Sequence, residues 1–213
     1  MKRPIILVVL FLAMLGLSAC QKRFEWNQKL TVVVETPDGE KSGSAVVHEI
    51  VHSGQLPMSA SAVNYEITGE ATIVEVAPGR YLFALLNGSE ERAARTWPGD
   101  RHDIDANWKR IEGLRESRLL PGDAWPTLVT FDDVNNPKSV RLADPENLSS
   151  TFGPGFALKE IRIEITDEKV TVGGVEKVLG WLANQNPVFV DWKKYPFDHP
   201  LRSLNKNSFS IGN

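Results

Sequence analysis

The residues with the clearest catalytic potential are His48, Glu49 and His52, which match the pattern H-E-x-x-H. On a helix, the two histidines would share one face and would be placed to bind a single zinc ion. Glu49 would then lie beside the metal, in a position to activate a zinc-bound water. This arrangement would make the protein a zinc-dependent hydrolase that uses His48, Glu49 and His52.

The surrounding sequence argues against that arrangement. Residues 44–51 are rich in β-branched side chains and are typical of a strand, in which four residues span about 13 Å and neighbouring side chains point to opposite faces. A third histidine ligand at the usual spacing would need glycine at position 55 and histidine at position 58, where Gln55 and Met58 stand. We therefore predict no catalytic residue, no metal site and no cofactor, and keep the zinc hydrolase as the alternative.

Other residue clusters indicate structure more than chemistry. Asp100 to Asp105 gathers carboxylates around His102 and is suited to a cation, but acidic residues are also typical of a helix N-terminus. No G-x-S-x-G elbow and no glycine-rich phosphate loop is present. The six tryptophans would suit a sugar-binding surface, but Trp108 and Trp181 fall next to or within apolar stripes that predict core packing.

The single cysteine, Cys20, follows a leader-like segment. Lys2 and Arg3 precede an uncharged apolar run over residues 5–15, and small residues follow it, as in a secretory signal peptide. The run is shorter than the about 20 residues that a membrane-spanning helix needs. We therefore predict a signal peptide over residues 1–19.

The end of this leader, Leu17-Ser18-Ala19-Cys20, resembles the lipobox of bacterial lipoproteins at each of its four positions. The resemblance implies cleavage between Ala19 and Cys20, a diacylglyceryl group on the Cys20 sulfur and a further acyl chain on its amino group. Two or more chains hold a protein stably on a lipid bilayer. By the sorting rule of these proteins, Gln21 implies the outer membrane, with the domain in the periplasm.

Composition limits the remaining possibilities. The formal net charge of −3 becomes more negative when Lys2 and Arg3 are removed, which argues against a nucleic-acid partner. With Cys20 acylated, the folded part has no thiol, so disulfides, thiolate metal sites and cysteine nucleophiles are excluded. We expect a tether over residues 20–28 and a single mainly-β domain over residues 29–213 that ends in a tail laid over its surface.

Hydrophobic periodicity predicts an α+β fold, mainly antiparallel β and sandwich-like, with two short amphipathic helices. The clearest elements are a hairpin of residues 29–36 and 44–51 around Pro37-Asp38-Gly39, and a strand over residues 81–86 that is apolar on both faces. The remaining predictions are strands at 65–68, 71–76, 127–131, 139–142, 161–165, 170–172 and 188–190, helices at 104–114 and 175–182, one helical turn at Asp144-Pro145, and a turn-rich segment at 87–103.

Three longer stretches, 30–47, 69–86 and 126–182, resemble a group of uncharacterised proteobacterial lipoproteins and exported proteins. The residues that carry this likeness are Glu35 to Gly39, Ser42 to Ser44, Gly79 to Leu86 and Phe152 to Gly155. The resemblance adds no catalytic residue and favours a strand over residues 44–51. We therefore expect a membrane-anchored envelope lipoprotein that acts as a non-enzymatic binding or scaffold module.

Overall fold

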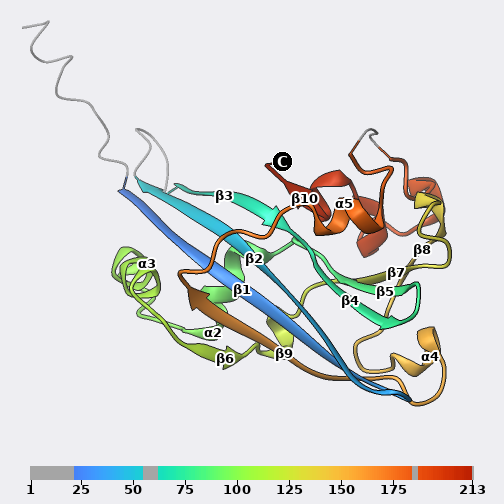
Figure 1. Ribbon diagram of the computed structural model, residues 1–213. Coiled ribbons are helices and arrows are strands. Elements are labelled where there is room, and N and C mark those ends of the chain that lie inside the picture. The colour runs from blue at the N-terminus through green and yellow to red at the C-terminus, as the bar shows by residue number, and fades with distance from the viewer. Residues whose placement is uncertain (1–21, 55–61, 184–186, 213) are drawn as a thin grey trace, which may run out of the picture.

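The computed structural model describes residues 22–54, 62–183 and 187–212. Two antiparallel sheets, with short helices around them, form an α+β, mainly β, sandwich-like fold (Figure 1). The predicted fold class is therefore confirmed. The signal segment 1–19 and Cys20 lie outside the described residues. Within the described ranges, no helix combines the length and hydropathy needed to cross a membrane.

The strands are β1 (Lys22–Thr36), β2 (Gly39–Gly54), β3 (Ala62–Glu70), β4 (Thr72–Ala77), β5 (Arg80–Ala84), β6 (Ser117–Leu119), β7 (Leu128–Phe131), β8 (Val140–Leu142), β9 (Ala157–Thr166) and β10 (Ser210–Ile211). The α-helices are α2 (Ser89–Thr96), α3 (Ile104–Glu112), α4 (Ser149–Phe152) and α5 (Gly174–Val178). Short 3₁₀ turns are η1 (Gly122–Ala124), η2 (Pro137–Ser139), η3 (Trp192–Lys194), η4 (Pro200–Ser203) and η5 (Lys206–Ser208).

The β1–β2 hairpin extends along the molecule and confirms the predicted hairpin (Figure 1). Its strands pair without a register shift from Lys22 opposite Ser53 to Thr36 opposite Gly39. Pro37 and Asp38 form the turn, and Gly39 has the positive φ of 99° for which glycine is suited. The Thr36 hydroxyl donates a 2.7 Å hydrogen bond to the Gly39 carbonyl and closes the turn.

The predicted tether over residues 20–28 is wrong from Lys22 onward, because β1 begins there. Phe24, Trp26 and Gln28 alternate with more exposed neighbours and are buried in the core. The polar residues between them belong to the outer face of the sheet. Gln28 is polar but lies on the inner face, so it interrupts the alternation of apolar and polar residues that marks a half-buried strand.

The two sheets have the strand orders β10-β3-β2-β1-β9-β6 and β4-β5-β7-β8. The main core lies between the two sheets and the helices α2 and α3, and it contains Val32, Leu82 and Ile163. A second core covers the other face of the smaller sheet and contains Phe83, Phe131 and Phe209. Adjacent residues of β5 thus enter different cores, which confirms that its strand is buried on both faces.

Helix α3 confirms the predicted amphipathic helix and its cap. Asp103 accepts a 2.9 Å hydrogen bond from the Ala106 amide, as an N-cap residue does. Helix α5 begins as predicted but ends at Val178. Helix α2 was missed, because its polar residues were interpreted as a turn-rich segment; its buried side includes Arg92 and Thr96 beside Ala93.

Three predictions of short elements were wrong. Residues 170–172 and 188–190 form no strand, although the Thr171 amide donates to the Val46 carbonyl across 2.9 Å. Asp144 caps a turn rather than a helix, by accepting a 2.9 Å hydrogen bond from the Glu146 amide. The short strands β6 and β10 were not predicted, because strands of two or three residues carry too little periodicity.

The C-terminal residues do more than lie on the surface. Residues 187–212 run along the second face of the smaller sheet, where Leu201 and Phe209 are buried. The chain then ends in β10, which pairs with the last residues of β3. This segment completes both the second core and one edge of the larger sheet.

Candidate functional site

The H-E-x-x-H motif lies in the middle of β2. Glu49 faces the core and is fully buried, whereas His48 and His52 lie on the opposite, outer face of the sheet. The residue pattern is therefore that of a half-buried strand, with Val47, Glu49 and Val51 facing inward.

Each histidine is held by residues of a neighbouring strand. His48 Nδ1 lies 2.7 Å from the Asn27 side-chain oxygen, and His48 Nε2 lies 3.8 Å from Glu25. His52 Nε2 lies 3.1 Å from Glu66. Among the described residues, no group of three metal-ligating side chains is placed to hold an ion.

This geometry is incompatible with the alternative zinc mechanism. Two histidines four residues apart on a strand are separated by about 13 Å along the backbone. A zinc ion needs both nitrogens at about 2.0–2.1 Å. Glu49, the base of that mechanism, points to the other side of the sheet.

The buried Glu49 instead anchors a polar cluster inside the main core. Gln28 Nε2 donates a 3.0 Å hydrogen bond to Glu49 Oε1, and the Ser89 hydroxyl donates to the same oxygen. Gln28 Nε2 also lies 2.9 Å from the Ser89 hydroxyl, and Trp26 Nε1 donates a 3.2 Å bond to the Gln28 oxygen. The cluster joins β1, β2 and the first residue of α2.

The environment of Glu49 favours its neutral form. Burial raises the pKa of Glu49 from 4.5 to about 8, against the opposing effects of the Ser89 hydrogen bond and of the nearby Arg92 charge. Glu90 adds a smaller upward shift. In the part of the chain that the structure describes, Glu49 Oε2 finds no hydrogen-bond partner. The neutral carboxyl avoids the cost of an uncompensated buried charge.

Arg92 is the second buried ionisable residue of this region. Its Nη2 donates to the Leu85 carbonyl at 2.8 Å and to the Asn87 carbonyl at 2.9 Å, and so holds the loop between β5 and α2. Burial lowers the pKa of Arg92 to about 10, while the charge of Glu49 opposes that shift. Both ionisable groups of this region are thus used to fix the position of α2 over the sheet.

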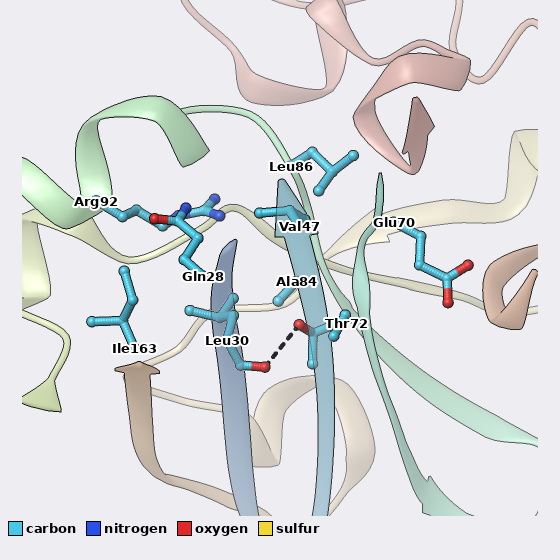
Figure 2. A pocket seen from close by; sticks show the side chains of 10 residues that line it. Gln28, Leu30, Val47, Glu70, Thr72, Ala84, Leu86, Arg92 and Ile163 are labelled. Atoms are coloured by element: carbon cyan, nitrogen blue, oxygen red, sulfur yellow. Dashed lines mark hydrogen bonds between the residues drawn. The ribbon is translucent and has the colours of Figure 1, made fainter. Parts of the chain in front are cut away.

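A small cavity adjoins the cluster between the two sheets (Figure 2). Its volume of about 10 Å³ is about that of one water. Gln28, Arg92 and Thr72 line it together with Leu30 and other apolar side chains, and the Thr72 hydroxyl donates a 3.2 Å bond to the Leu30 carbonyl. The cavity is too small for an organic substrate.

The Glu49–Ser89 contact has the atoms of a base and a hydroxyl nucleophile, but it has no access for a reactant. Glu49 and Ser89 are both fully buried. A nucleophile must lie within reach of the reacting atom of a bound substrate. We therefore assign the cluster a structural role.

A larger hollow opens at the surface between β3, α2 and α3, and we call it the groove. Its volume of about 460 Å³ is within the usual range for small-molecule sites. Its walls include the apolar or aromatic residues Val63, Tyr65, Ala94, Ile104 and Trp108. Tyr65 and Ile104 are 37% and 45% exposed, so apolar surface faces the solvent there.

Charged residues of both signs line the same groove. Glu91 and Arg95 form an ion pair at 2.6 Å, and the exposed Asp100 and Arg101 follow each other in the loop before α3. Burial and the charge of Glu91 raise the pKa of Tyr65, so its phenol is neutral at physiological pH. The groove therefore combines an aromatic wall with charged groups of both signs.

Trp108 forms the inner wall of the groove. It stacks on Trp26 with ring centroids 5.8 Å apart and meets the Tyr65 ring edge-on at 6.2 Å. Trp108 is only 5% exposed, and no described residue accepts a hydrogen bond from its indole Nε1. Buried donors without a partner are rare in folded proteins.

The Asp100–Asp105 cluster has a structural use. Asp103 caps α3, and Asp100 accepts a 2.8 Å hydrogen bond from the His102 amide. Asp105 accepts hydrogen bonds from Lys22 at 2.7 Å and from Ser53 at 2.6 Å, which lower its pKa. These bonds attach the start of α3 to the first residue of β1 and the end of β2.

Neither the buried cluster nor the groove was predicted from the sequence. The period of two in β2 places Glu49 on the apolar face and was a usable signal for its burial. The groove joins residues from three separate elements, so no local pattern signals it.

Comparisons of the chain with protein-family models, with curated proteins and with solved structures found no match.

Proposed function

We propose that this protein is a lipid-anchored binding module of the bacterial cell envelope, attached to the bilayer through Cys20, with the groove as its ligand site. The observation that carries the binding role is the groove itself. It is a concave surface of about 460 Å³ with aromatic walls and a few charged groups, the usual composition of a ligand site.

The anchor rests on the lipobox-like residues Leu17 to Cys20 and on the short apolar run before them. In this proposal, residues 1–19 are removed, and the acylated Cys20 holds the domain on the periplasmic side of the outer membrane. The outward polar face of the larger sheet, with Lys29, His48 and Glu164, is compatible with an aqueous compartment.

A non-enzymatic role fits the placement of the ionisable residues. The most strongly perturbed groups, Glu49 and Arg92, are enclosed in the core, and neither lines the groove. Perturbed groups that serve catalysis line a cleft that a substrate can enter. The groove contains the ion pair Glu91–Arg95 and aromatic side chains, which suit recognition of a ligand.

Replacement of Cys20 tests the anchor. The full-length chain and its Cys20→Ser variant would be expressed in a Gram-negative bacterium with labelled palmitate. We expect the parent to incorporate label and to sediment with outer membranes, and the variant to lose both properties. If the variant still incorporated labelled palmitate, or still sedimented with membranes, the anchor at Cys20 would be contradicted.

A fragment screen on the Cys20→Ser domain tests the binding role independently. Ligands that bind in the groove should shift the NMR signal of the Trp108 indole N–H. The Ala94→Arg variant, which fills the groove, should lose these shifts, while an Asp38→Arg variant in the distant hairpin turn should keep them. Hits whose shifts map elsewhere and survive Ala94→Arg would contradict the groove as the ligand site.

A further inference from the structure

We propose that the groove opens onto the lipid bilayer and takes the headgroup of one zwitterionic phospholipid from the leaflet in which Cys20 is anchored. This inference rests on the proposed anchor and adds to it an orientation of the domain and a chemical class of ligand.

The chain between the anchor and the sheet is very short. Only Gln21 lies between Cys20 and Lys22, where β1 begins. Two peptide units place the Cα atoms of Cys20 and Lys22 at most about 7–8 Å apart. The headgroup region of each leaflet is roughly 5–8 Å thick. The start of β1 must therefore lie at the headgroups.

The groove lies close to Lys22 in the fold. Lys22 pairs with Ser53, and Ser53 pairs with Val63, so these residues form one row across β1, β2 and β3. Val63 lines the groove and lies two strands from Lys22, about 10 Å away. Figure 1 shows α3 near the same end of the hairpin, far from the β1–β2 turn.

Helix α3 is attached to this row directly. Asp105 accepts hydrogen bonds from both Lys22 and Ser53, and its neighbour Ile104 lines the groove. The mouth of the groove is therefore held beside the start of β1, two residues from the anchor. An anchored domain cannot turn this end far from the bilayer.

The side chains of the groove suit a membrane interface. Tyrosine and tryptophan are enriched at membrane–water interfaces, where one side of the ring is apolar and the other is wet. Tyr65 supplies such a ring at the surface of the groove, and Ile104 supplies an exposed apolar side chain in the same groove. These residues match the boundary between headgroup and acyl chain.

The charges of the groove favour a zwitterion over an anion. Asp100 and Glu91 are carboxylates, and Arg101 and Arg95 are guanidinium groups, so the two signs balance. An anionic lipid would instead be matched by a cluster of basic side chains. A phosphoethanolamine group places an ammonium and a phosphate a few bonds apart and complements the neighbouring Asp100 and Arg101.

Orientation is tested with site-specific thiol probes. In the acylated chain Cys20 is blocked, so a single introduced cysteine is the only free thiol. Ile104→Cys at the groove and Asp38→Cys in the hairpin turn would each carry a fluorophore. The acylated proteins would be placed on phosphatidylethanolamine vesicles that contain a headgroup-labelled quencher lipid.

We expect the probe at position 104 to be quenched several-fold more strongly than the probe at position 38, which lies about 50 Å along β1 from the anchor. Equal quenching on protein that floats with the vesicles would overturn the orientation while leaving the anchor intact. Protein that fails to float with vesicles would refute the anchor, and with it the premise of this inference.

Ligand class is tested on the Cys20→Ser domain with dihexanoyl-phosphatidylethanolamine below its micelle concentration. We expect saturable shifts of the Trp108 indole N–H, at least about tenfold weaker binding of dihexanoyl-phosphatidylglycerol, and loss of the shifts in Ala94→Arg. Asp100 is exposed, so Asp100→Asn leaves the core unchanged. This variant should bind the ethanolamine lipid more weakly and should bind the glycerol lipid as the parent does.

Three outcomes would overturn the ligand assignment. Binding of the glycerol lipid as tightly as the ethanolamine lipid would show that the groove does not prefer a zwitterion. A response to octanoate without a response to the phospholipid would assign the groove to an acyl chain. Shifts that persist in Ala94→Arg would place the lipid outside the groove.

Discussion

At the scale of single residues, Glu49 shows how a strand can bury a carboxyl group without a cation bonded to it. Its Oε1 accepts hydrogen bonds from Gln28 and Ser89, and Arg92 acts on it only through space. Arg92 and Glu90 on α2, and Tyr65 on β3, are the titratable groups that interact with it. Because the shift of its pKa is upward, Glu49 links folding to proton uptake.

We predict that the free energy of unfolding falls as the pH rises from about 5 to 8. The folded protein holds a proton on Glu49 up to a pKa of about 8, whereas the unfolded chain releases it near the ordinary 4.5. The release of one proton changes the free energy of unfolding by at most about 1.4 kcal/mol per pH unit. In Glu49→Gln, which keeps an uncharged acceptor, this part of the slope should disappear.

Urea denaturation at several pH values measures this slope. Glu146→Gln, a change of an exposed carboxyl in the turn before α4, is the control and should leave the slope as in the parent. An unchanged slope in Glu49→Gln would show that the carboxyl is already ionised in the folded protein.

At the scale of elements, the long β1–β2 hairpin belongs to one sheet but crosses closely over the other. Gly43 of β2 lies at a place where β2 approaches β4 closely. A Cβ atom added there would lie 1.7 Å from the Ile73 carbonyl oxygen of β4. The sandwich therefore depends on a residue without a side chain at the point where its two sheets meet.

We predict that Gly43→Ala destabilises the protein by about 1–3 kcal/mol, because β2 and β4 must move apart to admit one methyl group. Thermal unfolding of Gly43→Ala and of Gly122→Ala gives the comparison. A Cβ atom added at Gly122 would meet no atom within 4 Å, and Gly122 has no positive φ, so its change should stay within about 0.5 kcal/mol. Similar effects of both changes would refute the close approach.

At the scale of the whole molecule, two cores share one sheet. The smaller sheet sends Leu82 and Ala84 into the main core, and Phe83 enters the second core from the same strand. The second core is closed by residues from the end of the chain, where Phe209 contacts the rings of Phe83 and Phe131. The last residues of the chain are thus required to bury the second face.

We predict that Phe209→Ala lowers the free energy of unfolding by about 3–5 kcal/mol, the usual loss for a large aromatic side chain in a core. Phe197→Ala is the matched control, because Phe197 is 88% exposed, and it should change stability by no more than about 0.5 kcal/mol. Equal losses, measured by urea denaturation, would show that the C-terminal segment does not form a core.

The sequence alone determined the elements whose signals are local. The Pro-Asp-Gly turn between β-branched runs specified the hairpin, and an apolar stripe after Asp103 specified α3, because turn chemistry and periodicity act over a few neighbouring residues. Only the tertiary structure decided that Lys22 to Gln28 join the sheet, that α2 forms over a buried Arg92, and that Glu49 meets Ser89 rather than a metal ion. The groove also forms only in the tertiary structure, because its walls come from β3, α2 and α3. The physical reason is the same in each case. Burial and surface shape arise from contacts between residues far apart in the chain, and a local sequence pattern does not predict those contacts.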